Sequence, residues 1–251
     1  MTGSDQELAG EVAIVTGAGI NTGSVIAATL AAAGAAVTIN YRHAKEGAER
    51  TVERIIQAGG RAIAVQGDVT IQADVQRVVQ QTLAAFGPPS ILVNNANMRS
   101  FRPVMGITIE EWRRTLGPTL EGTLFCVQGC VPHMRQLGHG TIVNIGGGSG
   151  HSGRPNRCHV AAAKAGLAGM TGSLASELAP DAITVNCIVP GKVDIRLPSP
   201  ERPALSHASP MKRGGEMQEI ADLVKFLCGK GCRFMTGEML HVNGAAYVTI
   251  A

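Results

Sequence analysis

Aromatic residues are scarce in this sequence, at 3% of 251 residues, whereas hydrophobic residues as a whole make up 45%. The core must therefore be built from aliphatic side chains, as is common in parallel sheets packed between helices. No apolar run approaches the roughly 18 residues of a membrane-spanning helix, and the N-terminal segment is polar. We therefore expect neither a membrane anchor nor a signal peptide, and we expect a cytoplasmic protein.

An excess of charge of one sign is also missing. The chain has 22 Lys and Arg against 19 Asp and Glu, a net charge of +3, with the two signs interspersed. There is no basic stripe to follow a phosphate backbone, so nucleic acid is not an expected partner. The six cysteines lack both the spacing of a zinc site and the density of a secreted disulfide framework. We expect reduced thiols and no metal site.

Short apolar segments alternate with longer amphipathic ones along the whole chain. This pattern predicts a βα repeat: an α/β, Rossmann-type, doubly wound parallel sheet of about seven strands with helices on both faces, in a single domain over residues 1–251. The expected strands are 11–17, 35–41, 61–69, 90–96, 140–146, 182–191 and 238–244. The expected helices are 23–33, 44–58, 71–86, 108–136, 157–178 and 217–228. Pro118 is expected to kink or interrupt the fourth helix, and the Pro- and Ser-rich segment 192–215 would suit a lid over a site.

A glycine-bearing turn, TGAGINTG at 16–23, follows the first expected strand and opens a helix. Free backbone N–H groups and the positive helix end can bind a dinucleotide pyrophosphate at such a place, and this context favours that reading over an ordinary tight turn. The second expected strand leads to Arg42, His43 and Lys45, without the acidic residue that holds the ribose 2′-hydroxyl of NAD. We therefore expect NADP(H) to be favoured over NAD(H); the alternative is a merely solvated basic cluster.

Several further short motifs occur along the whole chain. They are Thr16, Gly17 and Gly23 in a TGxxxGxG pattern, Asp68 in GDV, NNA at 94–96, Lys164 followed by Ala165 and Gly166, PG at 190–191, and HVNGA at 241–245. Through them the chain resembles the short-chain dehydrogenase/reductase family, of the 3-oxoacyl-acyl-carrier-protein reductase type, nearly from end to end. The resemblance implies a cofactor site made of Gly17, Gly19, Asn21, Thr22, Gly23, Arg42, His43, Asp68, Val69, Asn94, Asn95, Ala96, Lys164, Pro190, Gly191 and Val193. Asn21 stands where the family has the middle glycine of the turn.

The catalytic tetrad of that family, Asn, Ser, Tyr and Lys, is matched here only by Lys164. Val160 occupies the tyrosine position, Gly147 the serine position and Thr119 the asparagine position. In the family the tyrosine protonates the carbonyl oxygen, the serine steadies that oxygen, and the lysine binds the ribose and lowers the pKa of the tyrosine. Because general acid catalysis is worth roughly 10² to 10⁴ in rate, we do not expect an ordinary 3-oxoacyl reductase.

Three residues are candidate replacements for the missing donor groups. His159 directly precedes the vacant tyrosine position and is the leading candidate for the proton donor, although adjacent helix residues point about 100° apart. His151 and Ser149 follow the glycine run at 146–148. The proposed catalytic set is therefore Lys164, His159 and Ser149, and the alternative for each stand-in is a surface or capping role.

These observations lead to three hypotheses about function. The first is an NADP-dependent oxidoreductase that transfers hydride to a small-molecule carbonyl or conjugated enoyl substrate with a nonstandard proton donor. Enoyl reduction would ease the loss of the tyrosine, because the final proton goes to carbon. The alternatives are a cofactor-binding pseudoenzyme and a non-redox protein of the same fold. The resemblance further implies a homotetramer built through helices 108–136 and 157–178 and the last strand.

Overall fold

A computed structural model describes residues 6–193 and 209–248 of the chain. Most of the expected lid at 192–215 falls in 194–208 and lies outside the described residues. The strands are β1 (Val12–Val15), β2 (Ala36–Tyr41), β3 (Arg61–Gln66), β4 (Ile91–Asn94), β5 (Gly140–Ile145), β6 (Ile183–Pro190) and β7 (Met239–Val242). They form one sheet in the order β3-β2-β1-β4-β5-β6-β7, and every neighbouring pair is parallel. The predicted doubly wound sheet is confirmed.

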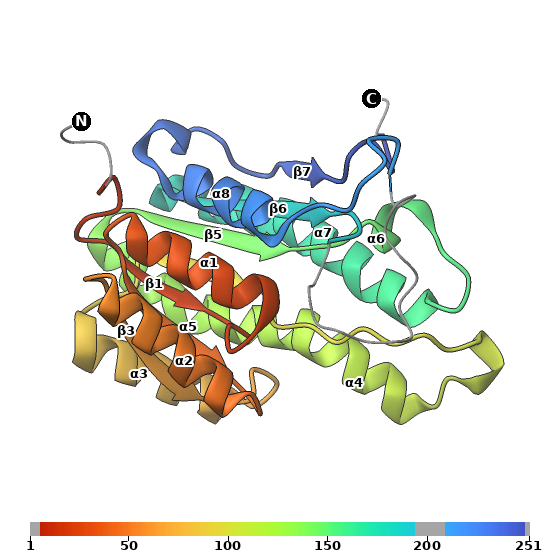
Figure 1. Ribbon diagram of the computed structural model, residues 1–251, viewed down its shortest axis with the longest axis horizontal. Coiled ribbons are helices and arrows are strands. Elements are labelled where there is room, and N and C mark those ends of the chain that lie inside the picture. The colour runs from red at the N-terminus through yellow and green to blue at the C-terminus, as the bar shows by residue number, and fades with distance from the viewer. Residues whose placement is uncertain (1–5, 194–208, 249–251) are drawn as a thin grey trace.

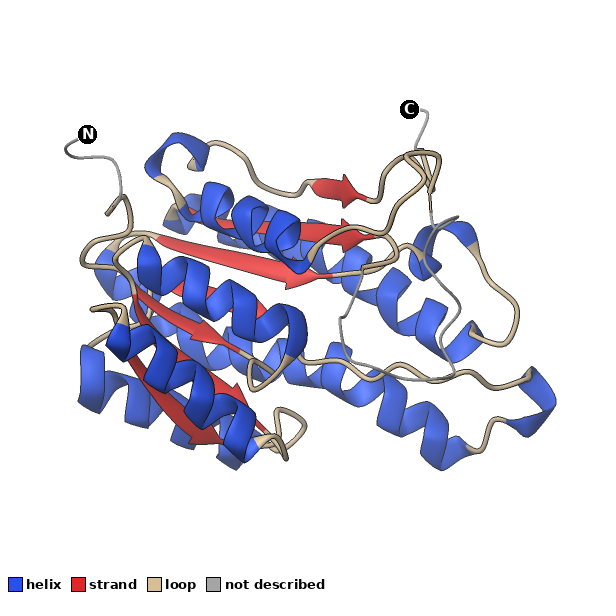
Figure 2. Ribbon diagram, viewed as in Figure 1, coloured by secondary structure: helices blue, strands red, loops and turns tan. Residues whose placement is uncertain are grey.

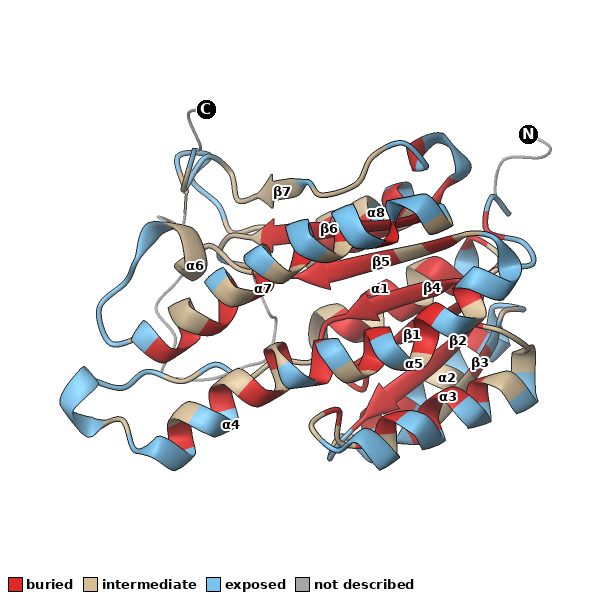
Figure 3. Ribbon diagram, turned by 180° about the vertical axis from the view of Figure 1, so that it is seen from behind, coloured by how far each residue is buried: buried red, intermediate tan, exposed pale blue. Residues whose placement is uncertain are grey.

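Helices cover both faces of this sheet. They are α1 (Asn21–Ala32), α2 (Lys45–Gln57), α3 (Gln72–Phe86), α4 (Ile109–Thr119), α5 (Glu121–Leu137), α6 (Ser149–Ser152), α7 (Cys158–Leu178) and α8 (Met217–Cys228), with single 3-10 turns η1 (Val104–Gly106), η2 (Ala179–Asp181) and η4 (Lys230–Cys232). Helices α1, α2 and α8 lie in front of the sheet in Figure 1, and α3, α5 and α7 lie on the opposite face, which Figure 3 shows from behind. Two aliphatic cores result, one on each face.

The strands at the centre of the sheet are apolar because they are buried on both faces. Every residue of β1, β2 and β4 is buried. All strand arrows point the same way in Figure 2, so the loops that follow them gather at one edge of the sheet. The strand order reverses between β1 and β4, and in sheets of this kind ligands bind outside the carboxyl ends of the strands at that switch point.

The single helix expected over 108–136 is two helices. Pro118, which lies within α4, has no N–H to donate to the preceding turn. The chain turns at Leu120, with φ −104° and ψ −63°, and α5 starts immediately after it. The predicted interruption is confirmed, and it places the junction between the two helices beside Thr119, at the vacant asparagine position.

Candidate functional site

The turn between β1 and α1 packs tightly against the segment that follows β4. Gly17 has φ +60°, and a Cβ there would lie 2.9 Å from Cα of Ala96. A Cβ on Gly23 would lie 2.6 Å from Nδ2 of Asn95. Two glycine positions therefore exclude any side chain, because the turn packs directly against the segment after β4. We call the turn at residues 16–23, together with the segment 94–96 that packs on it, the cradle.

Helix α1 begins without any side-chain cap. Ile20 occupies the N-cap position and accepts no backbone hydrogen bond with its side chain, and the first turn carries no acidic residue. Asn21 adopts φ 55°, a left-handed conformation that asparagine tolerates better than most residues, which explains how it replaces a glycine here. Thr22 is half-buried beside it. The backbone N–H groups and the positive end of α1 remain available to an anion such as a pyrophosphate.

The asparagines after β4 hold this cradle in place. Nδ2 of Asn95 donates to the carbonyl oxygens of Thr16 at 2.9 Å and Gly17 at 3.1 Å. Oγ1 of Thr16 accepts from the backbone N–H groups of Asn95 and Ala96, at 3.0 Å each. Asn94 points instead into the sheet, where its Nδ2 donates to Oδ1 of Asn144 at 2.9 Å. The first contribution of Asn94 and Asn95 is thus to brace β1, β4 and β5 at the site.

The residues expected at the ribose and adenine form an ion pair. Nε of Arg42 lies 2.9 Å from Oδ2 of Asp68, while Oδ1 of Asp68 accepts from the backbone N–H and the hydroxyl of Thr70. About half of the Arg42 side chain is exposed, and His43 is exposed beside it. Arg42 and His43 are therefore both accessible to solvent at the end of β2.

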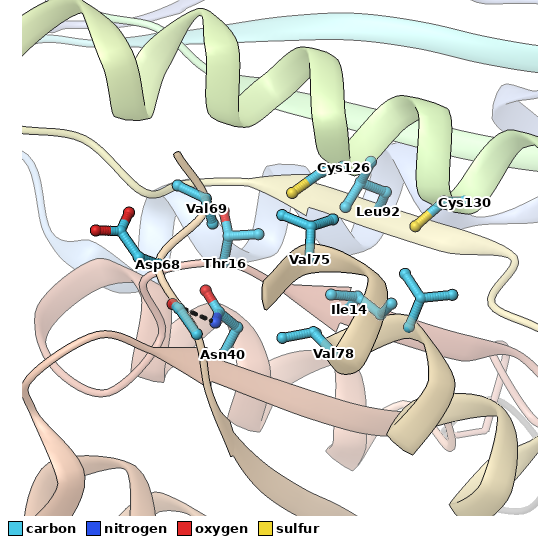
Figure 4. A pocket seen from close by; sticks show the side chains of 12 residues that line it. Ile14, Thr16, Asn40, Asp68, Val69, Val75, Val78, Leu92, Cys126 and Cys130 are labelled. Atoms are coloured by element: carbon cyan, nitrogen blue, oxygen red, sulfur yellow. Dashed lines mark hydrogen bonds between the residues drawn. The ribbon is translucent and has the colours of Figure 1, made fainter. Parts of the chain in front are cut away.

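A narrow apolar pocket opens beside Asp68 and Val69. Figure 4 shows Thr16, Asp68 and Val69 on one side and Cys126 and Cys130 at the far end. Its cavity volume is only about 10 Å³. Burial raises the pKa of the Cys126 thiol to about 12, so this wall is uncharged. The full lining is Ile14, Thr16, Asn40, Gly67, Asp68, Val69, Val75, Val78, Val79, Leu92, Cys126 and Cys130. A cavity of this size holds no more than about one water molecule, so the pocket as it stands is part of the apolar packing beside Asp68.

Lys164 is buried at the centre of the site. Its Nζ donates to the carbonyl oxygen of Ile145 at 2.8 Å. Burial, with a smaller contribution from the positive charge of Arg99, lowers the pKa of Lys164 to about 8. A Cβ on Gly147 would lie 3.7 Å from Cε of this lysine, so the vacant serine position faces it directly.

The other two vacant tetrad positions, Val160 and Thr119, are both buried. Val160 is 3% exposed. Oγ1 of Thr119 is buried and has no hydrogen-bond partner among the described residues. Neither side chain can replace a tyrosine hydroxyl, because valine carries no polar group and the threonine hydroxyl is enclosed.

His159 points away from the vacant tyrosine position, toward the loop that follows β4. The residue is fully buried, and its Nε2 lies 2.5 Å from Oγ of Ser100. Glu111 of α4 lies on the other side of Ser100: burial raises the pKa of Glu111, but a hydrogen bond from Ser100 and the nearby charge of Arg102 outweigh this and hold the pKa below its ordinary value. Nε of Arg102 donates to Oε2 of Glu111 at 3.1 Å. A buried polar network therefore joins α4, α7 and the loop after β4.

His151 belongs to a separate cluster of three rings. Its centroid is 5.0 Å from that of His241 on β7 and 5.7 Å from that of Tyr247. Burial, then the proximity of His151, lowers the pKa of His241. Ser149 is half-buried at the first position of α6, next to this cluster. The structure thus keeps His151 and Ser149 apart from the His159 network, on the β7 side of the site.

The nicotinamide end expected from the sequence lies between β6 and β7. The backbone N–H of Gly191 donates to the carbonyl of Val242 at 2.9 Å, and a Cβ on Gly191 would lie 2.8 Å from Cα of Asn243. Pro190 ends β6, and Val193 forms an isolated parallel bridge with Gly215. Pro190 and Gly191 therefore lie at the carboxyl end of β6, at the same edge of the parallel sheet as the turn after β1.

Residues 6–193 and 209–248 lack both a metal-binding cluster and a membrane-spanning helix. No group of three or more His, Cys, Asp or Glu side chains there could hold a metal ion. No helix within that part of the chain is long and apolar enough to cross a membrane.

The residues that sequence reasoning missed are Ser100, Glu111 and Tyr247. Each joins the site only through a contact between distant segments; Ser100 and His159 are 59 residues apart. No local motif marks such a pair. The acidic residues of "EEW" at 110–112 read as an ordinary first helical turn.

Known proteins resemble this chain over nearly its whole length. A sequence profile of the family described as "Enoyl-(Acyl carrier protein) reductase" matches residues 17–245. The 3-oxoacyl-acyl-carrier-protein reductase FabG of Staphylococcus epidermidis is 34% identical over 240 residues, which cover 94% of this chain and 98% of that protein. A dehydrogenase/reductase from Sinorhizobium meliloti has a TM-score of 0.91 and 33% identity, with 98% of both chains covered. A blue fluorescent protein from a metagenomic library, solved in complex with NADPH, has a TM-score of 0.89 and 32% identity, covering 96% of this chain and 100% of its own.

Proposed function

The chain belongs to the short-chain dehydrogenase/reductase family of oxidoreductases, and we propose that it uses NADP(H) to reduce a small-molecule carbonyl or conjugated enoyl substrate. The observation that carries the proposal is the cradle at the switch point, where Gly17 and Gly23 leave no room for a side chain and α1 begins uncapped. A dinucleotide pyrophosphate satisfies the free N–H groups of such a helix end. The bound nicotinamide supplies the hydride.

The preference for NADP(H) rests on the end of β2. Nε of Arg42 pairs with Asp68, and about half of the Arg42 side chain is exposed, so its remaining N–H groups can be donated to a 2′-phosphate on the adenosine ribose. His43 is exposed at the same edge. The structural neighbour described as a complex with NADPH is consistent with this assignment.

Lys164 would hold the nicotinamide ribose of the cofactor. Its ammonium already donates to Ile145, and its two remaining protons can be donated to ribose hydroxyls. Because Gly147 faces the lysine and carries no side chain, the substrate oxygen is not steadied from that position. Another group must supply the hydrogen bond and the proton.

We assign the proton supply to the Ser100 and His159 pair. His159 is fully buried, so its imidazole cannot touch a substrate directly, but Ser100 is half-buried and can. In its protonated form, His159 passes the Nε2 proton to Oγ of Ser100 as the Ser100 hydroxyl proton moves to the substrate oxygen or enolate. The carboxylate of Glu111, beside Ser100, stabilises the charged imidazole. Ser149 and His151 provide further polar side chains on the β7 side of the site.

A substrate screen tests this function. Ketones and enoyl thioesters are added to protein saturated with NADPH, and the absorbance of the reduced nicotinamide is followed. We expect turnover that is severely reduced in Lys164→Ala and in His159→Ala. Tight NADPH binding without turnover of any compound would favour a cofactor-binding pseudoenzyme, for which the vacant positions at Val160 and Gly147 are the argument. Activity that survives both substitutions would refute the assigned roles.

We also propose that the protein forms a homotetramer. β7 is an edge strand of the sheet, and apolar side chains are exposed on the neighbouring elements, among them Phe226 of α8 and Phe234. Exposed apolar surface of this kind is typical of subunit interfaces. Light scattering coupled to gel filtration gives the mass of the particle, and a monomer would contradict the proposal.

A further inference from the structure

Two loops, one after β4 and one before α7, are rich in arginine. The segment 97–103 after β4 carries Arg99 and Arg102, the segment 151–157 before α7 carries Arg154 and Arg157, and neither contains an acidic residue. The loops lie side by side, because the backbone N–H of Arg102 donates to the carbonyl of Asn156 at 2.8 Å. Four guanidinium groups are therefore carried by one pair of adjoining loops.

The guanidinium of Arg157 packs by its face on an aromatic ring, and one N–H at its edge lacks a hydrogen-bond partner among the described residues. Its Cζ lies 3.6 Å from the centroid of the Phe101 ring, a cation–π contact. Its Nε is buried and has no hydrogen-bond partner among the described residues. The N–H groups of a guanidinium lie in its plane, so contact of the face with a ring leaves them available. A buried N–H without a partner is costly unless a ligand accepts from it.

Two of the four arginines of these loops have side-chain contacts with neighbouring residues. Arg102 is engaged with Glu111 at 3.1 Å. The pKa of Arg157 is lowered first by burial, then by the charges of Arg154 and Arg99, which shows that the three guanidinium groups are near one another. Nε of Arg99 donates to Oδ1 of Asn97, whose Nδ2 donates to the carbonyl of Asn95, so Arg99 is tied to the cofactor cradle.

The spacing along α7 places this positive group beyond the reacting centre. Arg157 is the N-cap of α7, and Lys164 follows seven residues later, two turns along on the same face. With 1.5 Å per residue, their Cα atoms are roughly 10 Å apart along the helix axis. Val160, at the vacant tyrosine position, lies between them.

We propose that Arg157, together with Arg154, binds a carboxylate or phosphate group of the substrate, so that the enzyme acts on an anionic compound. The charged group of that compound lies roughly 10 Å from the ribose-binding lysine, far enough to be separate from the carbon that receives the hydride. This inference rests on the proposed function for its reaction, but the anion site itself is tested without turnover. An aromatic anchor, an unpartnered N–H and a second nearby arginine, Arg154, make the site suited to a planar carboxylate or a phosphate.

Calorimetric titration with two probes, inorganic phosphate and glutarate, tests the site. Each probe is titrated into wild-type protein and Arg157→Gln, with and without saturating NADPH; NADPH occupies the phosphate-binding end of α1, so the remaining binding reports the arginine loops. We expect Arg157→Gln to weaken binding of the better probe about tenfold or more, the effect of losing one hydrogen bond to a charged group. Arg157→Lys should retain part of the affinity. The matched control is Arg113→Gln, which removes an exposed arginine of α4 and should leave binding unchanged.

The outcomes separate this inference from the proposed function. Stronger binding of phosphate identifies a phosphorylated substrate, and stronger binding of glutarate identifies a carboxylic acid. Binding of either probe that is equally strong in wild type and Arg157→Gln, or no binding at all while NADPH binds normally, would overturn the anion site and leave the proposed function intact. Failure of NADPH to bind would refute the proposed function, and the Arg157-dependent part of the cofactor-free titration would still decide the anion site.

Discussion

Oγ of Ser100 lies 2.5 Å from Nε2 of the fully buried His159, and this contact joins the loop after β4 to the first turn of α7. It brings a hydroxyl and an imidazole together next to a site that has lost its tyrosine. If the pair supplies the proton, Ser100→Ala and His159→Asn should each lower kcat by about 10²-fold or more while the affinity for NADPH stays unchanged.

Steady-state kinetics at several pH values check this prediction. Removal of His159 should abolish the ionisation that the pair contributes to the pH profile of kcat, which a purely structural change would not do. Cys158→Ser alters the exposed neighbour on the same helix and serves as the control. An equal loss of NADPH affinity and kcat would indicate a folding role instead.

Arg42 should determine the choice of cofactor. Its side chain is about half exposed at the end of β2, so Arg42→Ala removes the charge expected at the 2′-phosphate. We expect NADPH to bind about tenfold more weakly or worse and NADH to bind almost as before. Arg50→Ala on the exposed face of α2 is the control. Equal weakening of the two cofactors would show that Arg42 acts through its ion pair with Asp68.

The tight approach at Gly23 gives a test of the cradle. A Cβ there would meet Nδ2 of Asn95 at 2.6 Å, so Gly23→Ala should lower the free energy of unfolding by about 1–3 kcal/mol and abolish cofactor binding. Gly169 of α7 is exposed and has nothing within 4 Å of its Cβ position. Gly169→Ala should therefore raise the free energy of unfolding by about 0.5–1 kcal/mol. Urea unfolding measures both, and a Gly23→Ala protein as stable as wild type would contradict the packing described.

Restoring the two missing donors should restore ordinary ketone reduction. The Cβ of a serine at Gly147 would make an ordinary 3.7 Å contact with Lys164, so that change fits without rearrangement. The double variant Val160→Tyr with Gly147→Ser should gain at least about 10²-fold in carbonyl reduction over wild type. Initial rates with a panel of ketones measure the gain. An unchanged rate in a folded, NADPH-binding variant would mean that the substrate is not held at Val160.

The buried ammonium of Lys164 predicts a pH dependence of stability. Its pKa falls from an ordinary 10.5 to about 8 on folding, so between these values the unfolded chain binds more protons than the folded one. This contribution to the free energy of unfolding rises with pH, by at most about 1.4 kcal/mol per pH unit. Buried thiols such as Cys126, with a pKa raised to about 12, act in the opposite direction.

Comparison with Lys164→Met isolates the lysine from the thiols. The difference in free energy of unfolding, wild type minus variant, should increase from pH 8 to pH 10, within the window between the two pKa values. A difference that is constant over this range would place the lysine in contact with solvent.

The fold could be predicted because local patterns carry it. Continuous apolar runs mark β1, β2 and β4, and an amphipathic helix follows β2, so the alternation of strands and helices predicts a doubly wound sheet. Pro118 predicts the break before α5, because proline has no backbone N–H to donate within a helix. The short helix α6 was not predicted, because four residues after a glycine run show no periodicity.

The candidate site could be predicted only where a motif is local. The turn around Gly17 and the position of Lys164 follow from short patterns in single segments. The direction of His159 does not, because a helix rotates about 100° per residue and the neighbouring segments decide which side is buried. The roles of Ser100 and Arg157 depend on contacts between the loop after β4 and the segment that opens α7, which are far apart in the sequence.

The most direct test of the account is a titration of the purified protein with NADPH and with NADH, followed by nicotinamide fluorescence. The cradle around Gly17 and Gly23 and the exposed guanidinium of Arg42 predict that both cofactors bind and that NADPH binds about tenfold more tightly or better. Binding of neither cofactor would mean that Asn21 closes the phosphate turn, and the proposed oxidoreductase activity would then be wrong.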